Sequence, residues 1–294
     1  MNRYNETVMK YVFLLCACIS VIAVLLICIF LFANGLPAIS EIGFKEFIFG
    51  TKWKPTSDIY GIFPMIVGSI YVTAGAILIG VPIGILTAIF MSKFCGDRLY
   101  KVLKPAVNLL AGIPSVVYGF FGLMVIVPFI RENFGGSGSS MLAASIVLGI
   151  MILPTIVGVS ESALRSVPDS YYEGSLALGA SHERSVFYAV FPAAKSGVMA
   201  GVILGIGRAI GETMAVIMVA GNQAVIPKSI LKGARTLTAN IVLEMGYAAD
   251  LHREALIATA VVLFVFILII NVSVSLIKRR ISWWITEQKW NQFS

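Results

Sequence analysis

Five long stretches of this chain contain no charged side chain, and this feature restricts the possible folds more than any other. They are residues 11–40, 59–92, 105–130, 133–160 and 255–277. A charged side chain at the centre of a bilayer costs about 2.5–3.5 kcal/mol, and roughly 20 apolar residues cross a hydrocarbon core of about 30 Å. Each stretch is long enough to cross. The chain is 58% hydrophobic and 13% charged, against roughly 25% charged residues in soluble domains, so the excess apolar surface must face lipid.

A sixth apolar stretch lies between Lys195 and Lys228, where only Arg208 and Glu212 interrupt it. The sequence therefore predicts an all-α, polytopic membrane protein with six transmembrane helices, at about 12–33, 63–91, 106–129, 141–160, 197–221 and 255–277. Continuous apolar runs exclude a transmembrane β-barrel, whose strands alternate in polarity. We expect three parts: an N-terminal anchor helix with an outer interfacial loop (1–62), a membrane domain (63–277) and a C-terminal tail (278–294).

The distribution of lysine and arginine predicts the orientation. The first apolar run, 12–33, is longer than the apolar part of a cleaved signal peptide, and no A-x-A cleavage site follows, so we expect a retained anchor. With the N-terminus inside, thirteen of the 22 Lys and Arg residues fall in inner segments and eight in outer ones. Positive charge accumulates on the cytoplasmic side. Both termini are therefore expected in the cytoplasm, and the net charge of +7 reflects this bias better than a nucleic-acid surface.

Several catalytic motifs are missing. The sequence has no Gly-Lys dipeptide, hence no Walker A loop for ATP phosphates, and no H-E-x-x-H zinc motif. Gly158-Val-Ser160 faintly resembles a serine nucleophile, but no histidine lies in any predicted span to act as its base. His182 and His252 fall in predicted loops and are expected at the surface. We expect a chain that is not an enzyme and that holds no metal or cofactor.

Arg208 and Glu212 are the charged residues inside a predicted span, and an ionisable residue within the membrane suggests a function. Their i, i+4 spacing puts them on one helix face, close enough to pair. Small residues share that face: Gly197, Gly201, Gly205 and Ala215. Small residues allow a neighbouring helix to approach closely, so this face is expected to point into the protein or into a wet pathway.

Two interpretations of this pair are compatible. In the structural one, Arg208 and Glu212 form a buried ion pair that fixes how the helix packs. In the functional one, Arg208 offers a delocalised charge and forked donors suited to phosphate-like oxyanions, and Glu212 moderates the attraction so that the anion is not trapped. Pro114, between Ile113 and Ser115 in the third predicted span, is either a packing kink or a break that lines the path.

The inner segment 161–196 is long for a connection between two spans and is unusually patterned. Pro168, followed by an acid, marks a helix start, and Gly179 marks its end. Ser181 caps a second short helix, which is expected to end before Pro192. The pattern predicts two short helices around a glycine turn.

Glu173, Gly179 and Pro192 have the spacing of the EAA loop of ABC-importer permeases: an acid, a glycine six positions on and a proline thirteen beyond. The loop departs from the family pattern at Gly174, Ser175, Ala189 and Phe191. In that family the loop docks in a cleft of the cytoplasmic ATP-binding subunit and transmits its closure to the membrane helices. The resemblance implies this coupling role for Glu173, Gly179 and Pro192.

Two further segments narrow the resemblance. Residues 207–215, GRAIGETMA, resemble the fifth-helix signature of phosphate-specific ABC-transporter permeases, and residues 111–119, AGIPSVVYG, resemble their third-helix segment. The outer loop with WKP at 53–55 and YGIFP at 60–64 is similar to the PstC type more than to the PstA type. The resemblance extends from about residue 53 to the end of the sixth span, and it is most specific in the fifth helix.

The resemblance implies a type I permease domain at 63–277, with 161–196 as its coupling loop, that moves inorganic phosphate inward across a bacterial plasma membrane. It implies four kinds of partner: the lipid bilayer, a homologous PstA-type permease, two cytoplasmic ATP-binding subunits that hold ATP and Mg, and an extracytoplasmic phosphate-binding protein. No nucleic-acid partner is expected. Two alternatives stay open: a permease for another oxyanion such as molybdate or sulfate, and a secondary transporter with Glu212 as a proton relay. The outer loop 34–60 is either an interfacial helix or a docking surface for the delivering protein.

Overall fold

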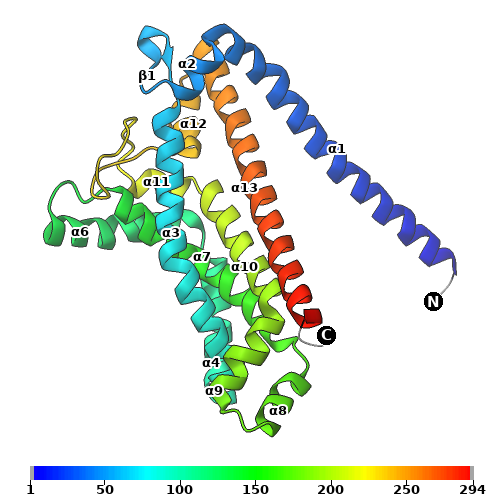
Figure 1. Ribbon diagram of the computed structural model, residues 1–294. Coiled ribbons are helices and arrows are strands. Elements are labelled where there is room, and N and C mark those ends of the chain that lie inside the picture. Colours follow the sequence, from blue (N-terminus) through cyan, green and yellow to red (C-terminus); the bar gives the residue numbers. More distant parts are fainter. Residues whose placement is uncertain (1–2, 292–294) are drawn as a thin grey trace.

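The computed structural model describes residues 3–291, with side chains placed from residue 7 to residue 273. It is almost wholly helical (Figure 1). Six helical segments are long and apolar enough to cross a membrane: Thr7–Ile42, Phe63–Phe94, Ser115–Phe134, Met141–Arg165, His182–Gly211 and Asp250–Ser273. The predicted all-α, six-span fold is confirmed, and a small two-stranded hairpin is added to it.

Fifteen α-helices and β-strands follow one another along the described part of the chain, residues 3–291. The first half contains α1 (Arg3–Ile42), α2 (Phe44–Phe49), β1 (Trp53–Lys54), β2 (Ile59–Tyr60), α3 (Phe63–Ile89), α4 (Asp97–Gly112), α5 (Ser115–Phe121) and α6 (Val127–Phe134). The second half contains α7 (Met141–Arg165), α8 (Asp169–Ala177), α9 (His182–Ser185), α10 (Phe191–Gly211), α11 (Met214–Val219), α12 (Leu237–Met245) and α13 (Asp250–Asn291). Single π-helical turns follow α3, join α5 to α6, and join α9 to α10, at Phe90–Phe94, Gly122–Ile126 and Val186–Val190.

The centre of the molecule is the packing of α3, α7 and α10 (Figure 1). Ile156 of α7 is fully buried and lies between glycines of its two neighbours. A Cβ added to Gly84 of α3 would lie 2.8 Å from the Ile156 side chain, and one added to Gly205 of α10 would lie equally close. Gly197 and Gly201 also face α7. The predicted close approach of a neighbouring helix to this glycine face is confirmed, because only a residue without Cβ allows it.

The helix α1 leaves the body of the molecule, and only the part near its end contacts α13 (Figure 1). There Phe32 meets Phe264 edge-to-face, with ring centroids 6.1 Å apart, and Gly35 packs against Ala258. The large apolar side chains from Val8 to Phe30 are exposed. Such a surface requires lipid or another transmembrane segment to cover it.

Two of the predicted spans are not continuous helices. The predicted helix 106–129 is interrupted at Ile113 and Pro114, both of which are extended, because proline lacks an N–H and disfavours a helical residue before it. The predicted helix 197–221 ends at Gly211, and Glu212 is extended. The resulting short helices α5 and α11 pack against each other, so the two breaks belong to the same part of the fold.

The end of the bundle that carries the hairpin, which we call the hairpin end, has its own core. β1 and β2 pair antiparallel, with Trp53 opposite Tyr60. Phe47 of α2, Met65 of α3 and Leu237 of α12 are fully buried there. α8 and α9 lie at the opposite end, the α8 end (Figure 1). The expected tail 278–294 continues α13 as far as residue 291, and 292–294 lie outside the described residues.

Candidate pathway and coupling loop

Arg208 lies in the last turn of α10 and is partly buried. Its Nη1 donates a hydrogen bond to Thr155 Oγ1 of α7 at 3.3 Å. The charge of Arg208 also acts on Tyr118 of α5, which lies just after the first helix break, at Pro114. Among the side chains that the structure describes, no carboxylate forms an ion pair with Arg208. Most of its donors are therefore free for an anion.

Glu212 does not form the ion pair with Arg208 that the i, i+4 spacing predicts, so the structural interpretation of the pair is wrong for this conformation. The helix ends one residue earlier, at Gly211, and the side chain of Glu212 leaves the helical face. Its Oε1 accepts a hydrogen bond from the Ala215 backbone N–H at 3.1 Å. Its carbonyl oxygen accepts one from Thr238 Oγ1 at 2.9 Å. Glu212 therefore holds the start of α11 and ties it to α12.

The helix breaks leave backbone groups without helical partners. One of them is satisfied across the first break, where Tyr118 Oη donates to the Leu110 carbonyl oxygen at 2.8 Å. Non-helical backbone at membrane depth is tolerated only where protein buries it or where it lines a wet cavity, and discontinuous helices are typical of transporter substrate sites. An arginine without an acidic partner beside two such breaks is suited to bind an oxyanion transiently.

The segment between α7 and α10 has the two short helices and the glycine turn that the sequence predicts. α8 ends at Ala177, and Gly179 follows with a φ of 84°, a conformation that favours glycine. Ser181 caps α9, since its Oγ accepts from the Arg184 N–H at 3.3 Å. Glu173 and Gly179 are exposed, and Leu178 at the turn is 91% exposed. The tip of this segment is thus free to contact another chain.

The second short helix does not end before Pro192, contrary to the prediction. It continues through the π-helical turn Val186–Val190 into α10, where Pro192 occupies the first turn. Proline is tolerated in a first turn, and the π-helical register provides such a turn within a continuous helix. His182–Gly211 is consequently one uninterrupted helical segment of 30 residues.

His182 is partly buried and anchors this segment, whereas the sequence predicts a surface histidine. Its Nδ1 is 2.7 Å from Tyr172 Oη of α8, and Phe94 packs edge-to-face on its ring with centroids 4.6 Å apart. Lys93 Nζ lies 3.7 Å from an Asp169 carboxylate oxygen. The π-helical turn that follows α3 is therefore attached to both short helices.

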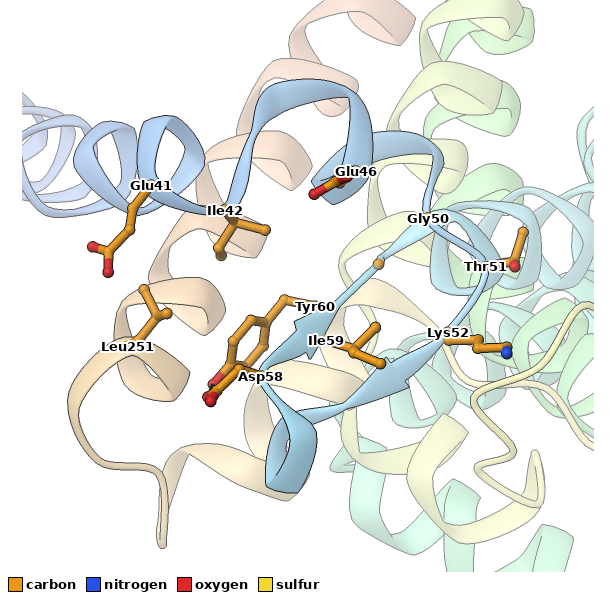
Figure 2. Close-up of a pocket in the computed structure, with 11 residues that line it drawn as sticks. Glu41, Ile42, Glu46, Gly50, Thr51, Lys52, Asp58, Ile59, Tyr60 and Leu251 are labelled. Atoms are coloured by element: carbon orange, nitrogen blue, oxygen red, sulfur yellow. Dashed lines mark hydrogen bonds between the residues drawn. The ribbon is translucent and has the colours of Figure 1, made fainter.

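A pocket of about 600 Å³ opens at the hairpin end, between α1, α2, the hairpin and the start of α13 (Figure 2). Glu41, Glu46 and Asp58 contribute carboxylates to its lining, and Lys52 contributes an amine. Tyr60 is buried there and donates a hydrogen bond to Asp58 at 3.2 Å. Its burial, together with this bond, raises the pKa of Tyr60. The tyrosine therefore remains a hydrogen-bond donor at physiological pH.

Glu244 of α12 is the centre of a polar cluster beside this pocket and is 6% exposed. Its carboxylate binds Arg235 Nη1 at 2.6 Å, Trp53 Nε1 at 2.8 Å and His252 Nε2 at 2.9 Å. His252 is largely buried, so its expected place at the surface is also wrong. The cluster joins the hairpin, the 220–236 loop, α12 and α13. Trp53 is 191 positions from Glu244 in the sequence, so no local pattern reveals the cluster.

Sequence reasoning also missed Thr155 and Glu161. Thr155 follows Pro154 within an apolar run, where nothing distinguishes it from other small residues. The sequence predicts that Glu161 begins the inner segment, yet Glu161 lies within α7 and is 1% exposed. The position of Glu161 at the end of an apolar run is a signal for a special role. Its partner Lys104, at 2.5 Å, is 57 positions away, so the sequence does not indicate the pair.

Comparison with known proteins places this arrangement in a family. The family described as binding-protein-dependent transport system inner membrane component matches residues 80–283. The chain is 44% identical over 267 residues to the probable ABC transporter permease protein YqgH of Bacillus subtilis, covering 87% of this chain and 86% of that protein. It is 36% identical to the phosphate transport system permease protein PstC of Mesorhizobium japonicum, and the match covers 83% of this chain and 81% of that protein.

Solved structures agree on the fold. The structure resembles a bacterial ABC transporter involved in the import of alginate with a TM-score of 0.63 at 14% identity, covering 95% of this chain and 99% of that chain. It also resembles the MetNI methionine ABC transporter with a TM-score of 0.58 at 21% identity. This match covers 78% of this chain and 99% of that chain. The matched family segment, the relatives and the shared fold establish that the chain belongs to the binding-protein-dependent transport system inner membrane components, the membrane-spanning permeases of ABC importers.

Proposed function

We propose that this chain is the permease subunit that carries inorganic phosphate inward across a bacterial plasma membrane. The observation that carries this proposal is the position of Arg208 beside two helix breaks, where none of the carboxylates that the structure describes forms an ion pair with it. The relatives of the chain include phosphate permeases. The chain itself performs no catalysis and holds no cofactor. ATP and Mg are bound by two partner ATPase subunits in the cytoplasm.

Arg208 and Glu212 are assigned to the substrate pathway. Arg208 presents a planar fork of donors that matches two oxygens of a tetrahedral anion. Thr155 orients the fork through the hydrogen bond to Nη1. Glu212 lies at the adjacent break, where its charge weakens the hold of Arg208 on the anion and its carboxylate secures α11. An arginine opposed in this way binds the anion long enough to orient it and still releases it.

Glu173, Gly179 and Pro192 are assigned to coupling. The turn around Gly179 presents apolar and aromatic side chains outward, with Leu178 the most exposed of them. We propose that this tip docks in the cleft of the ATPase subunit. Pro192 lies where the α9 helix continues into α10. A conformational change of the ATPase subunits is therefore transmitted along one continuous helix to Arg208.

The α8 end is therefore assigned to the cytoplasm, together with both termini, and the hairpin end to the outside. The pocket lined by Glu41, Glu46, Lys52 and Asp58 (Figure 2) lies where a delivering phosphate-binding protein would dock. The exposed apolar surface of α1 suits lipid and the second permease, a PstA-type homologue. Residues 1–62 serve as anchor and outer cap, 63–277 as the permease domain with 161–196 as its coupling segment, and 278–294 as the cytoplasmic tail.

The test is uptake of labelled phosphate into proteoliposomes that contain the complete transporter, with ATP inside or outside the vesicles. Competition with arsenate, sulfate and molybdate identifies the substrate. Uptake that needs ATP and the ATPase subunits, and that only phosphate and arsenate inhibit, is the expected result. Stronger inhibition by molybdate or sulfate would reassign the substrate. Transport by the membrane chains alone, driven by an ion gradient, would refute the importer assignment in favour of a secondary transporter.

A further inference from the structure

Glu161 is a buried acid near the end of α7 and the first residue of the coupling segment 161–196, and the roles assigned above to Arg208, Glu212, Glu173, Gly179 and Pro192 do not account for it. It is 1% exposed, and a buried carboxylate is unfavourable unless charges and hydrogen bonds compensate it. Here both kinds of compensation are present. Lys104 Nζ lies 2.5 Å from Oε2, Tyr100 Oη donates to Oε1 at 3.0 Å, and Arg165 forms an ion pair with Oε1.

Two of these partners belong to α4, which is otherwise loosely held. None of the α4 residues, all of which the structure describes, is buried. Lys104 and Tyr100 are spaced i, i+4 on one helix face, so both reach the same carboxylate of α7. The Glu161 carboxylate is therefore the main polar attachment of α4 to the body of the protein.

Arg165 extends the attachment to the π-helical turn Phe90–Phe94 that follows α3. Its guanidinium carbon lies 3.9 Å from the centroid of the Tyr100 ring, within the range of a cation–π contact. Its Nη2 donates to the Met91 carbonyl oxygen at 3.0 Å. Two residues further on, Lys93 pairs with Asp169 at the first residue of α8. The Glu161 cluster thus lies next to the point where the coupling segment joins the bundle.

The other end of α4 leads to the pathway. α4 ends at Gly112, directly before the break at Pro114. The carbonyl oxygen of Leu110, in its last turn, accepts a hydrogen bond from Tyr118, on which the charge of Arg208 acts. The helix α4 therefore connects the Glu161 cluster with the helix break at Pro114.

We infer that Glu161 is a positioning residue that fixes α4 to α7 and thereby makes the helix break at Pro114 follow movements of the coupling segment. This inference rests on the proposed function, since it assigns a role within ATP-driven transport. If the attachment is removed, the ATPase continues to hydrolyse ATP, but its movement no longer reaches the pathway. Phosphate transported per ATP hydrolysed is the quantity that reports this role.

The main experiment compares variants of the complete transporter in proteoliposomes, with ATP hydrolysis and phosphate uptake measured on the same samples. Glu161→Gln keeps the shape and loses the charge; it should leave hydrolysis within about twofold and lower uptake per ATP at least tenfold. Lys104→Met should lower uptake per ATP severalfold. Lys104→Arg keeps the charge and should leave uptake per ATP unchanged. The double variant Glu161→Gln/Lys104→Met should be no worse than Glu161→Gln alone, because both changes remove one interaction.

Glu132→Gln, at an exposed acid of α6, is the matched control and should leave uptake per ATP unchanged. Unchanged uptake per ATP in Glu161→Gln would overturn the inference. An equal fall in hydrolysis and uptake, which leaves their ratio constant, would also overturn it, because that is the result expected of a residue that only stabilises the fold.

A second measurement does not depend on phosphate being the substrate. Spin labels are placed at Val102→Cys on α4 and Ser162→Cys on α7, both exposed positions, in a chain whose four native cysteines are replaced. The distance distribution between the labels should be narrow with Glu161 and broad in Glu161→Gln. Equal distributions would refute the attachment. If the wild-type transporter failed to carry phosphate, the proposed function would be refuted. A broadened distance distribution in Glu161→Gln would still support the attachment of α4 to α7.

Discussion

Arg208 of α10 and Thr155 of α7 are joined by a hydrogen bond of 3.3 Å between Nη1 and Oγ1, and this contact sets where the guanidinium points. Without it, a long side chain at the end of a helix would sample several rotamers. The bond occupies one donor on one nitrogen and leaves the remaining edge of the guanidinium open. The geometry suits a residue that has to receive an anion in a fixed orientation.

Replacing Arg208 should abolish phosphate transport while the protein still assembles in the membrane. Arg208→Gln keeps a donor for Thr155 but loses the charge, so the initial rate of phosphate uptake should fall at least about 100-fold, equivalent to roughly 2.7 kcal/mol. Arg208→Lys should recover only part of the rate, because an ammonium group lacks the fork. Uptake is measured with equal amounts of assembled transporter. A normal rate in Arg208→Gln would remove this residue from the pathway.

Replacing Thr155 should weaken substrate binding through Arg208. A hydrogen bond to a charged group contributes about 1.5–3 kcal/mol, so Thr155→Val should raise the KM for phosphate by about tenfold. Thr155→Ser retains the hydroxyl and should behave like the wild type. Concentration series of uptake separate KM from the maximal rate. If valine and serine gave the same KM, the hydroxyl would have no part in orienting the guanidinium.

The coupling turn should be sensitive to changes of backbone and charge. Gly179→Pro forces φ to about −65°, whereas Gly179 has a φ of 84°, and Glu173→Lys reverses an exposed charge. Both variants should insert into the membrane yet lose ATP-dependent uptake. Gly174→Ala is the control, since its Cβ would have open space and alanine favours the helix by about 1 kcal/mol. Normal uptake by Gly179→Pro or Glu173→Lys would refute the docking role of this turn.

The Glu244 cluster should stabilise the hairpin end. Glu244→Ala leaves Arg235 without its ion pair in a largely buried position, and breaking a buried pair costs about 3 kcal/mol. The Tm of the detergent-solubilised protein should fall by several degrees, and the intrinsic fluorescence of Trp53, which donates to the Glu244 carboxylate, should change. Glu254→Gln, an exposed acid on α13, is the comparison. Equal Tm values for both variants would show that the cluster contributes no stability.

The sequence predicted the membrane class well because the cost of burying charge in lipid is local: it acts residue by residue along the chain. Four predicted spans lie within continuous helices of the structure, and the glycine face of α10 packs as expected. The turn at Gly179 was also predictable, because glycine and the Ser181 cap act within a few residues.

The two helix breaks show where this local reasoning ends. Pro114 gave a signal for the first break, but nothing in the run around Gly211 requires a helix to end there. Tertiary contacts decide that break: Thr238 binds the Glu212 carbonyl oxygen, and the Glu212 side chain caps α11. Without the break, Glu212 would face Arg208 as the spacing predicts.

The sequence by itself determined that this chain crosses a membrane six times and carries a glycine turn typical of coupling loops, because hydrophobicity and backbone preference are properties of short segments. Only the tertiary structure decided which charges meet. It separated Arg208 from Glu212, joined Arg208 to Thr155, and brought Lys104 to Glu161 and Trp53 to Glu244. A buried charge must be compensated by whatever packs beside it, and the partner comes from a distant helix whose position depends on the whole fold.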